Sequence, residues 1–200
     1  MSASESVATR RPARIASRGV SHDQTGHRAL SVALYMHDLS GGGVERQSLI
    51  LASELRAEGI DVTLVLHQVR GPLLANLPAD VRVVDLKSRR TLQDIPRLAS
   101  FLRRSRPDIL LANLDHNNIA AMLAKAVAFS RTRVVICQHN PISASFAAFE
   151  SWTYKLVPLA YRSLSVLASR AVAVSSGVAA ELNSLAGVPS RKIYTIHNPV

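Results

Sequence analysis

The stretch Ser31–Glu58, SVALYMHDLSGGGVERQSLILASELRAE, decides the fold of this chain. It opens with an apolar run over residues 32–36, which has the length and composition of a buried strand. A polar turn and three consecutive glycines follow, and a helical pattern then ends at Gly59, where a left-handed cap residue is expected. The predicted inner face of this helix carries Val44, Ser48, Leu51, Ala52 and Leu55.

The glycine turn between this strand and helix suits an anion. Without Cβ atoms, the backbone of Gly41, Gly42 and Gly43 can approach a ligand closely, and the first N–H groups of a helix have no internal partners. Together with the helix dipole, these groups attract phosphate. The alternative is an ordinary turn without a ligand. Three glycines cost more chain entropy than such a turn requires, which favours the anion site.

Two common phosphate ligands are disfavoured by the residues around the turn. Arg46 stands where the dinucleotide fingerprint requires its third glycine, and the strand over residues 62–66 ends in His67 and Gln68 with no carboxylate. The Gly-Lys-Ser/Thr of a P-loop is absent as well. Neither NAD nor ATP is therefore expected by those routes.

Strand and helix patterns alternate along the rest of the chain. Further strands are predicted at 62–66, 81–86, 109–112, 134–137, 171–174 and 192–196. Further helices are predicted at 94–104, from an N-cap at Asp115, over 145–170 and at 177–185. Uniformly apolar strands of this kind predict an α/β fold, a Rossmann-like parallel sheet with helices on both faces. Polar bends at 40–44, 113–117 and 138–141 follow three strands, and ligands of such sheets bind there.

The composition limits the class of partner. The chain has 200 residues, 48% of them hydrophobic, which is enough for one sizeable core, and a formal net charge of +10. Anionic lipid or a phosphorylated substrate fits this charge, although a solvated basic face is an equally simple explanation. Nucleic acid is the weakest candidate, because aromatic residues make up 4% and no binding motif is visible.

Residues 1–29 are predicted to be a disordered basic tail. This segment is rich in serine, alanine and arginine and lacks the apolar core of a secretory signal. No apolar run in the chain approaches the length of a membrane span. Cys137 is the single cysteine, so a reducing compartment is compatible. These features favour a cytoplasmic location, with peripheral contact at the membrane face.

Six segments in order resemble one known family. They are HDLSGGGVERQ, ELRAEGIDVTLV, NLDHNN, VVICQHNP, AVAVSSGVAAEL and IYTIHNPV. In this order they resemble the family 4 glycosyltransferases, which have the two-domain GT-B fold. The resemblance covers roughly residues 31–200 and corresponds to that family's N-terminal domain. It implies residues 30–197 as the acceptor-side domain and 198–200 as the start of a linker to a C-terminal donor domain that this sequence lacks.

The resemblance also implies a reaction and a set of site residues. The reaction is the transfer, with retention, of a sugar from a nucleotide-sugar to a carbohydrate or lipid-linked acceptor, without a catalytic metal or a cofactor. Gly42, Gly43 and Val44 would face the donor diphosphate, and His139 would sit at the reacting sugar. The acceptor side would be lined by His116, Asn117 and Asn140. Without the donor domain, the chain is expected to be inactive.

Structural roles remain open for the same residues. His139 can close a strand end, which its position makes the less favoured role, and His116 and Asn117 can simply help to start a helix. The alternative to an enzyme is a non-catalytic Rossmann-like binding module, or the acceptor-half subunit of a split glycosyltransferase. A dehydrogenase or epimerase is disfavoured by Arg46 and by the missing acid after the second strand.

Overall fold

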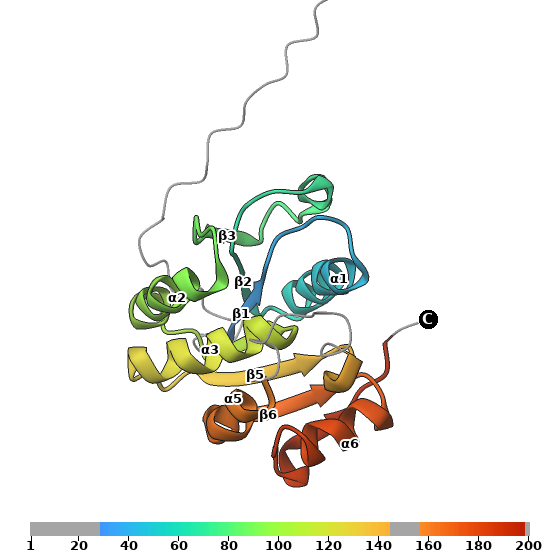
Figure 1. The fold of residues 1–200 in the computed structure, drawn as a ribbon. Helices are drawn as coiled ribbons and strands as arrows, with labels where there is room; N and C mark the ends of the chain where they lie inside the picture. Colours follow the sequence, from blue (N-terminus) through green and yellow to red (C-terminus); the bar gives the residue numbers. More distant parts are fainter. Residues whose placement is uncertain (1–28, 145–156, 199–200) are drawn as a thin grey trace, which may run out of the picture.

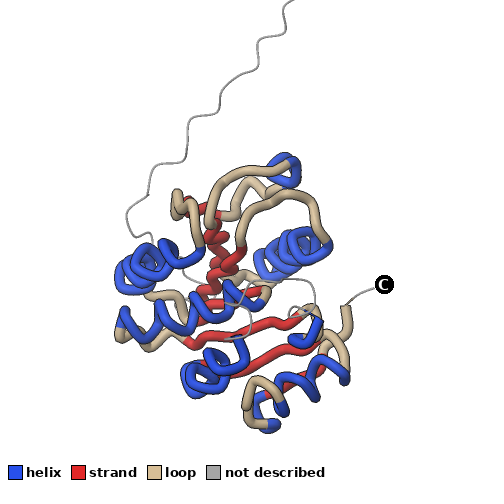
Figure 2. Tube along the Cα trace, viewed as in Figure 1, coloured by secondary structure: helices blue, strands red, loops and turns tan. Residues whose placement is uncertain are grey.

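The computed structural model describes residues 29–144 and 157–198. Its strands form one seven-stranded parallel sheet in the order β3-β2-β1-β4-β5-β6-β7. Figures 1 and 2 show helices packed around this sheet. The strands are β1 (Ser31–Met36), β2 (Asp61–Leu66), β3 (Arg82–Asp85), β4 (Ile109–Asn113), β5 (Arg133–Gln138), β6 (Ala168–Ala173) and β7 (Ile193–Thr195). The predicted Rossmann-like α/β fold is confirmed.

Helices connect the strands and cover both faces of the sheet. The described α-helices are α1 (Gly43–Ala57), α2 (Thr91–Ser105), α3 (Asp115–Ala128), α5 (Val157–Leu164) and α6 (Ser176–Ser184). Short 3-10 helices are η1 (Pro72–Asn76), η3 (Ser165–Leu167) and η4 (Ser190–Lys192). In Figure 1, α1 lies on one side of β1 and β2 and α2 on the other. Across residues 29–144 and 157–198, no helix is both long and apolar enough to cross a membrane.

Two hydrophobic clusters hold these layers together. Successive side chains of a strand point to opposite faces, so Ala33 and Tyr35 of β1 join the cluster formed with α2 and α3. Leu34 and Met36, on the other face of β1, join the cluster that contains Leu49 of α1. Burial on both faces explains why the strands read as continuous apolar runs in the sequence.

The strand order places a reversal between β1 and β4. The chain leaves β1 toward β2 on one side, whereas β4 pairs with the other edge of β1. In open parallel sheets, the connections diverge at such a point and leave a crevice beside the carboxyl ends of the strands. The glycine turn after β1 and the bend after β4 both lie at this edge.

Two predictions of local structure are wrong. Leu114, with φ 74°, is the N-cap residue of α3, and Asp115 is the first residue of the helix instead. Its carboxylate accepts a hydrogen bond from Gln138 Nε2 at 2.6 Å, which removes it from a capping role. On α1, Leu51 is 37% exposed and Leu49 is buried in its place, so the inner face is rotated from the prediction.

The predicted helix over residues 145–170 is only partly testable, because residues 145–156 lie outside the described ranges. Within the described part, α5 ends at Leu164 and β6 already begins at Ala168. The sequence Ala-Ser-Arg-Ala is compatible with a helix, but its backbone pairs with β5, and this pairing decides its conformation. The tail over residues 1–28 and the last two residues also lie outside the described ranges.

Candidate functional site

The glycine turn presents the beginning of α1 to solvent. Gly41 has a φ of +111°, a conformation that residues with a Cβ rarely adopt. Gly42 is the extended N-cap residue and makes no side-chain capping bond, and Gly43 begins the helix. Both are exposed, and a Cβ on Gly43 would meet no atom within 4 Å. The first N–H groups of α1 have no side-chain cap, so they are available to bind an anion.

Glu45 shares this space. A Cβ built on Gly42 would lie 2.3 Å from Glu45 Oε2, so the carboxylate folds back over the turn. A negative side chain in the first turn of a helix is stabilised by the helix dipole. The absence of a side chain at Gly42 leaves room for this carboxylate. An incoming anion would compete with it for the first N–H groups of the helix.

The turn is held in place by the loop that follows β2. Leu39 N donates to Arg70 O at 3.0 Å, and Leu73 N donates to Leu39 O at 3.2 Å. Gly71, with φ +113°, allows this approach, because a Cβ there would lie 2.1 Å from Leu39 O. The backbone after β1 and the backbone after β2 thus pack directly on each other. Gly71 fixes the position of the glycine turn.

An ion pair braces the same contact. Asp38 Oδ2 accepts from Arg70 Nε at 2.8 Å, and Asp38 Oδ1 accepts from Ser40 N at 3.1 Å. Burial alone would raise the pKa of Asp38, but the hydrogen bonds from Ser40 and Arg70 outweigh it and lower that pKa. The carboxylate therefore stays charged at neutral pH and tethers the turn.

Three histidines gather beside the turn. The rings of His37, after β1, and His67, after β2, stack with centroids 4.3 Å apart. The ring of His116, in the first turn of α3, meets His37 edge-on at 6.2 Å. Burial, and then the neighbouring His67, lower the pKa of His37, while burial and then His37 lower that of His116. We call His37, His67 and His116 the histidine cluster.

The histidine cluster rests on a buried carboxylate. His67 Nδ1 donates to Asp94 Oδ2 at 2.8 Å, and Tyr35 Oη donates to the same oxygen at 2.6 Å. Asp94 is fully buried in α2, and burial together with this carboxylate raises the pKa of Tyr35. Sequence reasoning missed Tyr35 and Asp94. The available signal was that His37 and His67 follow adjacent strands directly.

His139 lies at the carboxyl end of β5 and contacts the end of β4. Its Nε2 is 3.0 Å from Asn113 Oδ1. A carboxamide oxygen can only accept, so Nε2 carries the proton and, in the neutral ring, Nδ1 keeps a lone pair. This Nδ1 is buried and has no hydrogen-bond partner among the described residues. Burial lowers the pKa of His139, which favours the neutral ring, so Nδ1 is a hydrogen-bond acceptor that a ligand hydroxyl reaches once this atom is uncovered.

The other predicted acceptor residues occupy different environments. Asn117 is 0% exposed, and neither its Nδ2 nor its Oδ1 has a partner in the described part of the chain. Asn140 is exposed, and its carbonyl accepts from Gln138 Nε2 at 2.9 Å. His116 is half-buried within the histidine cluster. The structure thus brings His116 to His37, and His139 to Asn113, along one edge of the sheet.

A buried polar network supports the bend after β5. Tyr161 Oη donates to Gln138 Oε1 at 3.2 Å, and Asn118 Nδ2 donates to Tyr161 Oη at 3.0 Å and to Cys137 O at 2.9 Å. These bonds link α5, α3 and β5 directly beneath His139. Burial raises the pKa of the Cys137 thiol to about 12, so Cys137 is a core residue rather than a nucleophile.

No metal centre is formed by the residues that the structure describes. In these ranges, no group of three or more histidine, cysteine, aspartate or glutamate side chains is arranged to hold an ion. What the carboxyl edge offers instead is uncapped amide donors at α1 and hydrogen-bonding imidazoles. These groups bind phosphate oxygens and hydroxyl groups.

Solved structures share this architecture. The lipopolysaccharide outer core galactosyltransferase WaaB matches with a TM-score of 0.65 and 13% identity, over 86% of this chain and 46% of that chain. Anabaena HepE in complex with UDP-glucose matches with a TM-score of 0.62 and 16% identity, over 86% of this chain and 44% of that chain. MurG of Acinetobacter baumannii matches with a TM-score of 0.56 and 14% identity, over 86% of this chain and 46% of that chain. This chain therefore spans less than half the length of each.

The fold is accordingly that of the N-terminal half of a GT-B glycosyltransferase. The chain belongs to Glycosyltransferase Family 4, whose model matches residues 41–200. No match was found among curated proteins. The family membership confirms the resemblance that the six sequence segments indicated.

Proposed function

We propose that this chain is the acceptor-side half of an enzyme that transfers a sugar from a nucleotide-sugar to a carbohydrate or lipid-linked acceptor. The observation that carries the proposal is the exposed, uncapped beginning of α1 at the edge where the strand order reverses. Family 4 membership and the similarity to HepE, which is solved with UDP-glucose, support a nucleotide-sugar donor. We further propose hexosyl transfer with retention and without a metal.

The glycine turn would stabilise the leaving group. When the sugar departs, negative charge develops on the nucleoside diphosphate, and preorganised amide donors stabilise such charge where it forms. We assign this role to Gly42, Gly43 and Val44. Removing one such donor in enzymes costs roughly 3 kcal/mol of transition-state stabilisation. In this proposal, the Glu45 carboxylate moves away from the turn when the diphosphate binds.

The imidazoles would bind hydroxyl groups. We assign His139 to the reacting sugar, because its unpartnered Nδ1 is able to accept from a sugar hydroxyl while Asn113 holds Nε2. His116, Asn117 and Asn140 are assigned to the acceptor side. Of these, Asn117 has to be uncovered for a direct contact, because none of its surface is exposed.

The rest of the catalytic pocket would come from a donor-side domain. We propose residues 30–197 as one acceptor-side domain and residues 198–200 as the start of the linker to the other. Relatives more than twice as long as the matched segment support this division. The chain alone would then be inactive. We also propose a cytoplasmic location with peripheral contact to an anionic membrane, which the buried free thiol of Cys137 and the net charge of +10 support.

The diphosphate site is tested by titrating the labelled chain with UDP and recording amide NMR spectra. We expect shifts at Gly42, Gly43 and Val44. Gly59, at the other end of α1, is the matched control, and its amide signal should not shift. Shifts confined to other parts of the chain would refute the assignment of the glycine turn.

The enzymatic proposal needs a separate assay. Sugar transfer is measured with the 200-residue chain and with a version extended by a donor-side domain, and only the extended version should turn over. Robust turnover by the shorter chain would contradict the half-site proposal. His139→Ala in the extended enzyme should lower kcat far more than it weakens donor binding, and an unchanged kcat would remove His139 from the site.

The second candidate is a non-catalytic binding module or the acceptor-half subunit of a split glycosyltransferase. The uncapped glycine turn is compatible with both, because the turn would bind an anion whether or not the protein catalyses a reaction. A reading frame that continues into a donor-side domain favours the single enzyme, and a separate neighbouring gene for that domain favours the split one. Tight NAD binding would instead favour a dehydrogenase or epimerase.

A further inference from the structure

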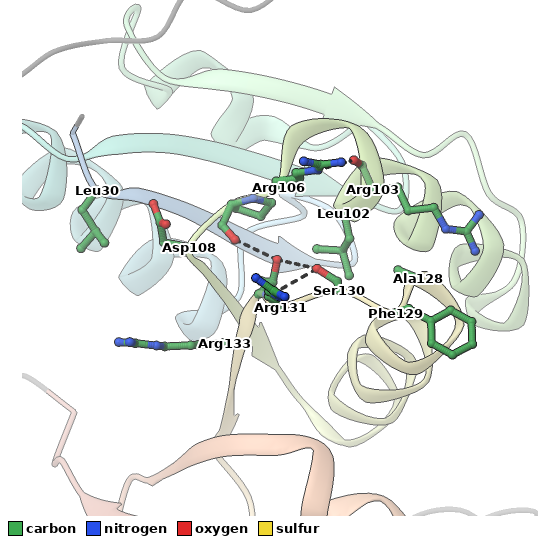
Figure 3. A pocket seen from close by; sticks show the side chains of 12 residues that line it. Leu30, Leu102, Arg103, Arg106, Asp108, Ala128, Phe129, Ser130, Arg131 and Arg133 are labelled. Atoms are coloured by element: carbon green, nitrogen blue, oxygen red, sulfur yellow. Dashed lines mark hydrogen bonds between the residues drawn. The ribbon is translucent and has the colours of Figure 1, made fainter. Parts of the chain in front are cut away.

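A second feature lies at the opposite end of the sheet from the glycine turn. A hollow of about 810 Å³ opens where α2 and α3 end and β4 and β5 begin, as Figure 3 shows. Its floor is closed by buried groups: Thr132 Oγ1 donates to Pro107 O at 2.8 Å, and Ser130 bonds to Thr132. Its rim carries Leu30, Arg103, Arg106, Phe129, Arg131 and Arg133. We call these six residues the amino-end face.

Phe129 is the most unusual residue of this face. Its side chain is 93% exposed. It also has a φ of 49°, in the left-handed conformation that helix ends normally give to glycine or asparagine. A phenyl ring in water adds nothing to folding, and the strained backbone opposes it. Folding therefore gives no reason for phenylalanine at this position.

Further apolar surface surrounds the hollow. Leu30 is 46% exposed on the other side of it, and Val127, two residues before Phe129, is 45% exposed. The inner side of α3 is occupied by other residues, among them the alanines at 120, 121, 124 and 128. The amino-end face is thus apolar at two sides.

Arginines occupy the space between these apolar groups. Arg103 donates through Nη2 to Val127 O at 2.6 Å, so the helix dipole and a free carbonyl explain its position. Arg131 and Arg133 follow α3 and lie in neither helix, so that explanation does not extend to them. Their guanidinium groups point away from each other in Figure 3 and do not converge on one point. The charge is spread over a surface rather than focused on a single small anion.

One acidic residue, Asp108, also lines the hollow, and its Oδ2 accepts from Ser31 N at 2.9 Å and from Ser31 Oγ at 2.7 Å. In the sequence, the segment before Leu30 carries Arg28 and four more arginines against two acidic residues.

We propose that the amino-end face binds the surface of a bilayer that contains anionic phospholipids. Exposed aromatic and aliphatic side chains enter the interfacial region, and surrounding arginines bind lipid phosphates through paired N–H donors. A rigid apolar residue amid spread positive charge matches such a surface. Duplex nucleic acid would use the same charge, and its binding is one outcome of the test. The proposal does not depend on the sugar-transfer assignment, since it involves the other end of the sheet.

The orientation that follows is specific. Strands of six residues rise by about 20 Å, so the glycine turn and His139 would face away from the bilayer at least that far above it. An acceptor that remained in the membrane would have to extend over this distance to reach them. Membrane binding and sugar transfer should therefore be separable by mutation.

The test is co-sedimentation of the full chain with vesicles made of equal parts phosphatidylglycerol and phosphatidylcholine, or of phosphatidylcholine alone. We expect binding to the anionic vesicles only, with an affinity that falls as salt is added. The variant Phe129→Ser/Arg131→Gln/Arg133→Gln should bind at least about 30-fold more weakly, because each arginine near an anionic surface contributes about fivefold. Its substituted side chains are all exposed, so circular dichroism should confirm an unchanged fold.

The matched control is Leu92→Ser/Arg89→Gln/Arg90→Gln. It removes the same charge and one exposed apolar side chain, at the beginning of α2 and so at the other end of the domain. It should keep most of the vesicle affinity. Equal losses in both variants, or no binding of the unmodified chain to anionic vesicles, would overturn the proposal. The proposal would also be overturned if the unmodified chain bound duplex DNA or inorganic phosphate more tightly than anionic vesicles, and if the Phe129→Ser/Arg131→Gln/Arg133→Gln variant lost that binding.

Insertion is tested separately with Phe129→Trp and Leu92→Trp. Vesicles with brominated acyl chains should quench the tryptophan at position 129 more strongly than the one at position 92. Trp152 gives the same background in both variants. Equal quenching would show that position 129 stays outside the bilayer and would overturn the proposed orientation.

Discussion

The two ends of the sheet are built in opposite ways. At the carboxyl end, polar groups are buried beneath the surface, and several of them, including His139 Nδ1 and both polar atoms of Asn117, have no partner among the described residues. At the amino end, the buried polar groups are satisfied by one another, and what faces solvent is Phe129 and arginine. This difference supports the two proposals made above, a ligand with directional hydrogen bonds at the carboxyl end and an extended anionic surface at the amino end.

This separation follows from the parallel topology. All strands point the same way, so each strand-to-helix turn reaches the carboxyl end and each helix-to-strand turn reaches the amino end. Helix N-termini, with their free N–H groups, collect at the first end, and helix C-termini, which favour basic side chains, collect at the second. One chain can therefore hold an anion-binding site and a basic surface without interference between them.

Gly71→Ala should give the largest effect on the carboxyl end. The added methyl group would lie 2.1 Å from Leu39 O and would require a left-handed alanine, so the backbone of the glycine turn has to move. We expect the free energy of unfolding to fall by about 2–4 kcal/mol, measured by chemical denaturation.

Gly43→Ala is the matched control for this change. A Cβ there meets nothing within 4 Å, and alanine is the better helix former, so stability should change by less than about 1 kcal/mol. Similar losses in both variants would mean that contact with Leu39 does not position the turn.

The second prediction concerns pH. Burial first, and then the neighbouring imidazoles, lower the pKa values of His37 and His116, so the folded chain binds fewer protons there than the unfolded chain. Stability contributed by these neutral rings is present above about pH 6.5 and is lost as pH falls below it. Because both rings are partly exposed, we expect a loss of about 1 kcal/mol between pH 7 and pH 5.

The measurement is the melting temperature across that pH range for the unmodified chain and for His37→Gln/His116→Gln, whose slope should be shallower. His197→Gln lies outside the histidine cluster and should keep the original slope. An unchanged slope in the double variant would assign the pH dependence to other groups.

The third prediction tests the amino end. Phe129→Gly should raise the free energy of unfolding by about 1 kcal/mol, because glycine adopts the left-handed conformation without strain and the exposed ring contributes no packing. The same variant should lose vesicle affinity. A loss of stability in this variant would show that Phe129 is held by contacts within the domain.

The smallest expected effect concerns Glu45→Gln. Removing a negative charge from the beginning of α1 should tighten UDP binding by roughly two- to fivefold, which corresponds to about 0.3–1 kcal/mol for a charge at a helix terminus. Calorimetry measures the affinity, and Glu54→Gln, on an exposed part of the same helix, is the control. Weaker binding of UDP would mean that Glu45 supports the ligand rather than competing with it.

Much of this architecture was readable from local patterns. The strand before the glycines, the left-handed Gly59, and the strand ends at residues 113 and 138 lie where the apolar periods and turn residues indicated. These features depend on the properties of neighbouring residues in the chain, such as the size of a side chain and the freedom of a glycine backbone. The prediction that ligand-binding groups gather at one edge rests on the same parallel alternation.

The sequence by itself determined the alternating α/β fold, the glycine turn and the family, because each is written in short segments. Only the tertiary structure decided that Tyr35, His67 and Asp94 form one buried group, that Gly71 supports Leu39, and that Phe129 stands exposed beside arginines. Such pairings join residues up to 59 positions apart, and they follow from the order in which strands are placed in the sheet. No local pattern specifies that order.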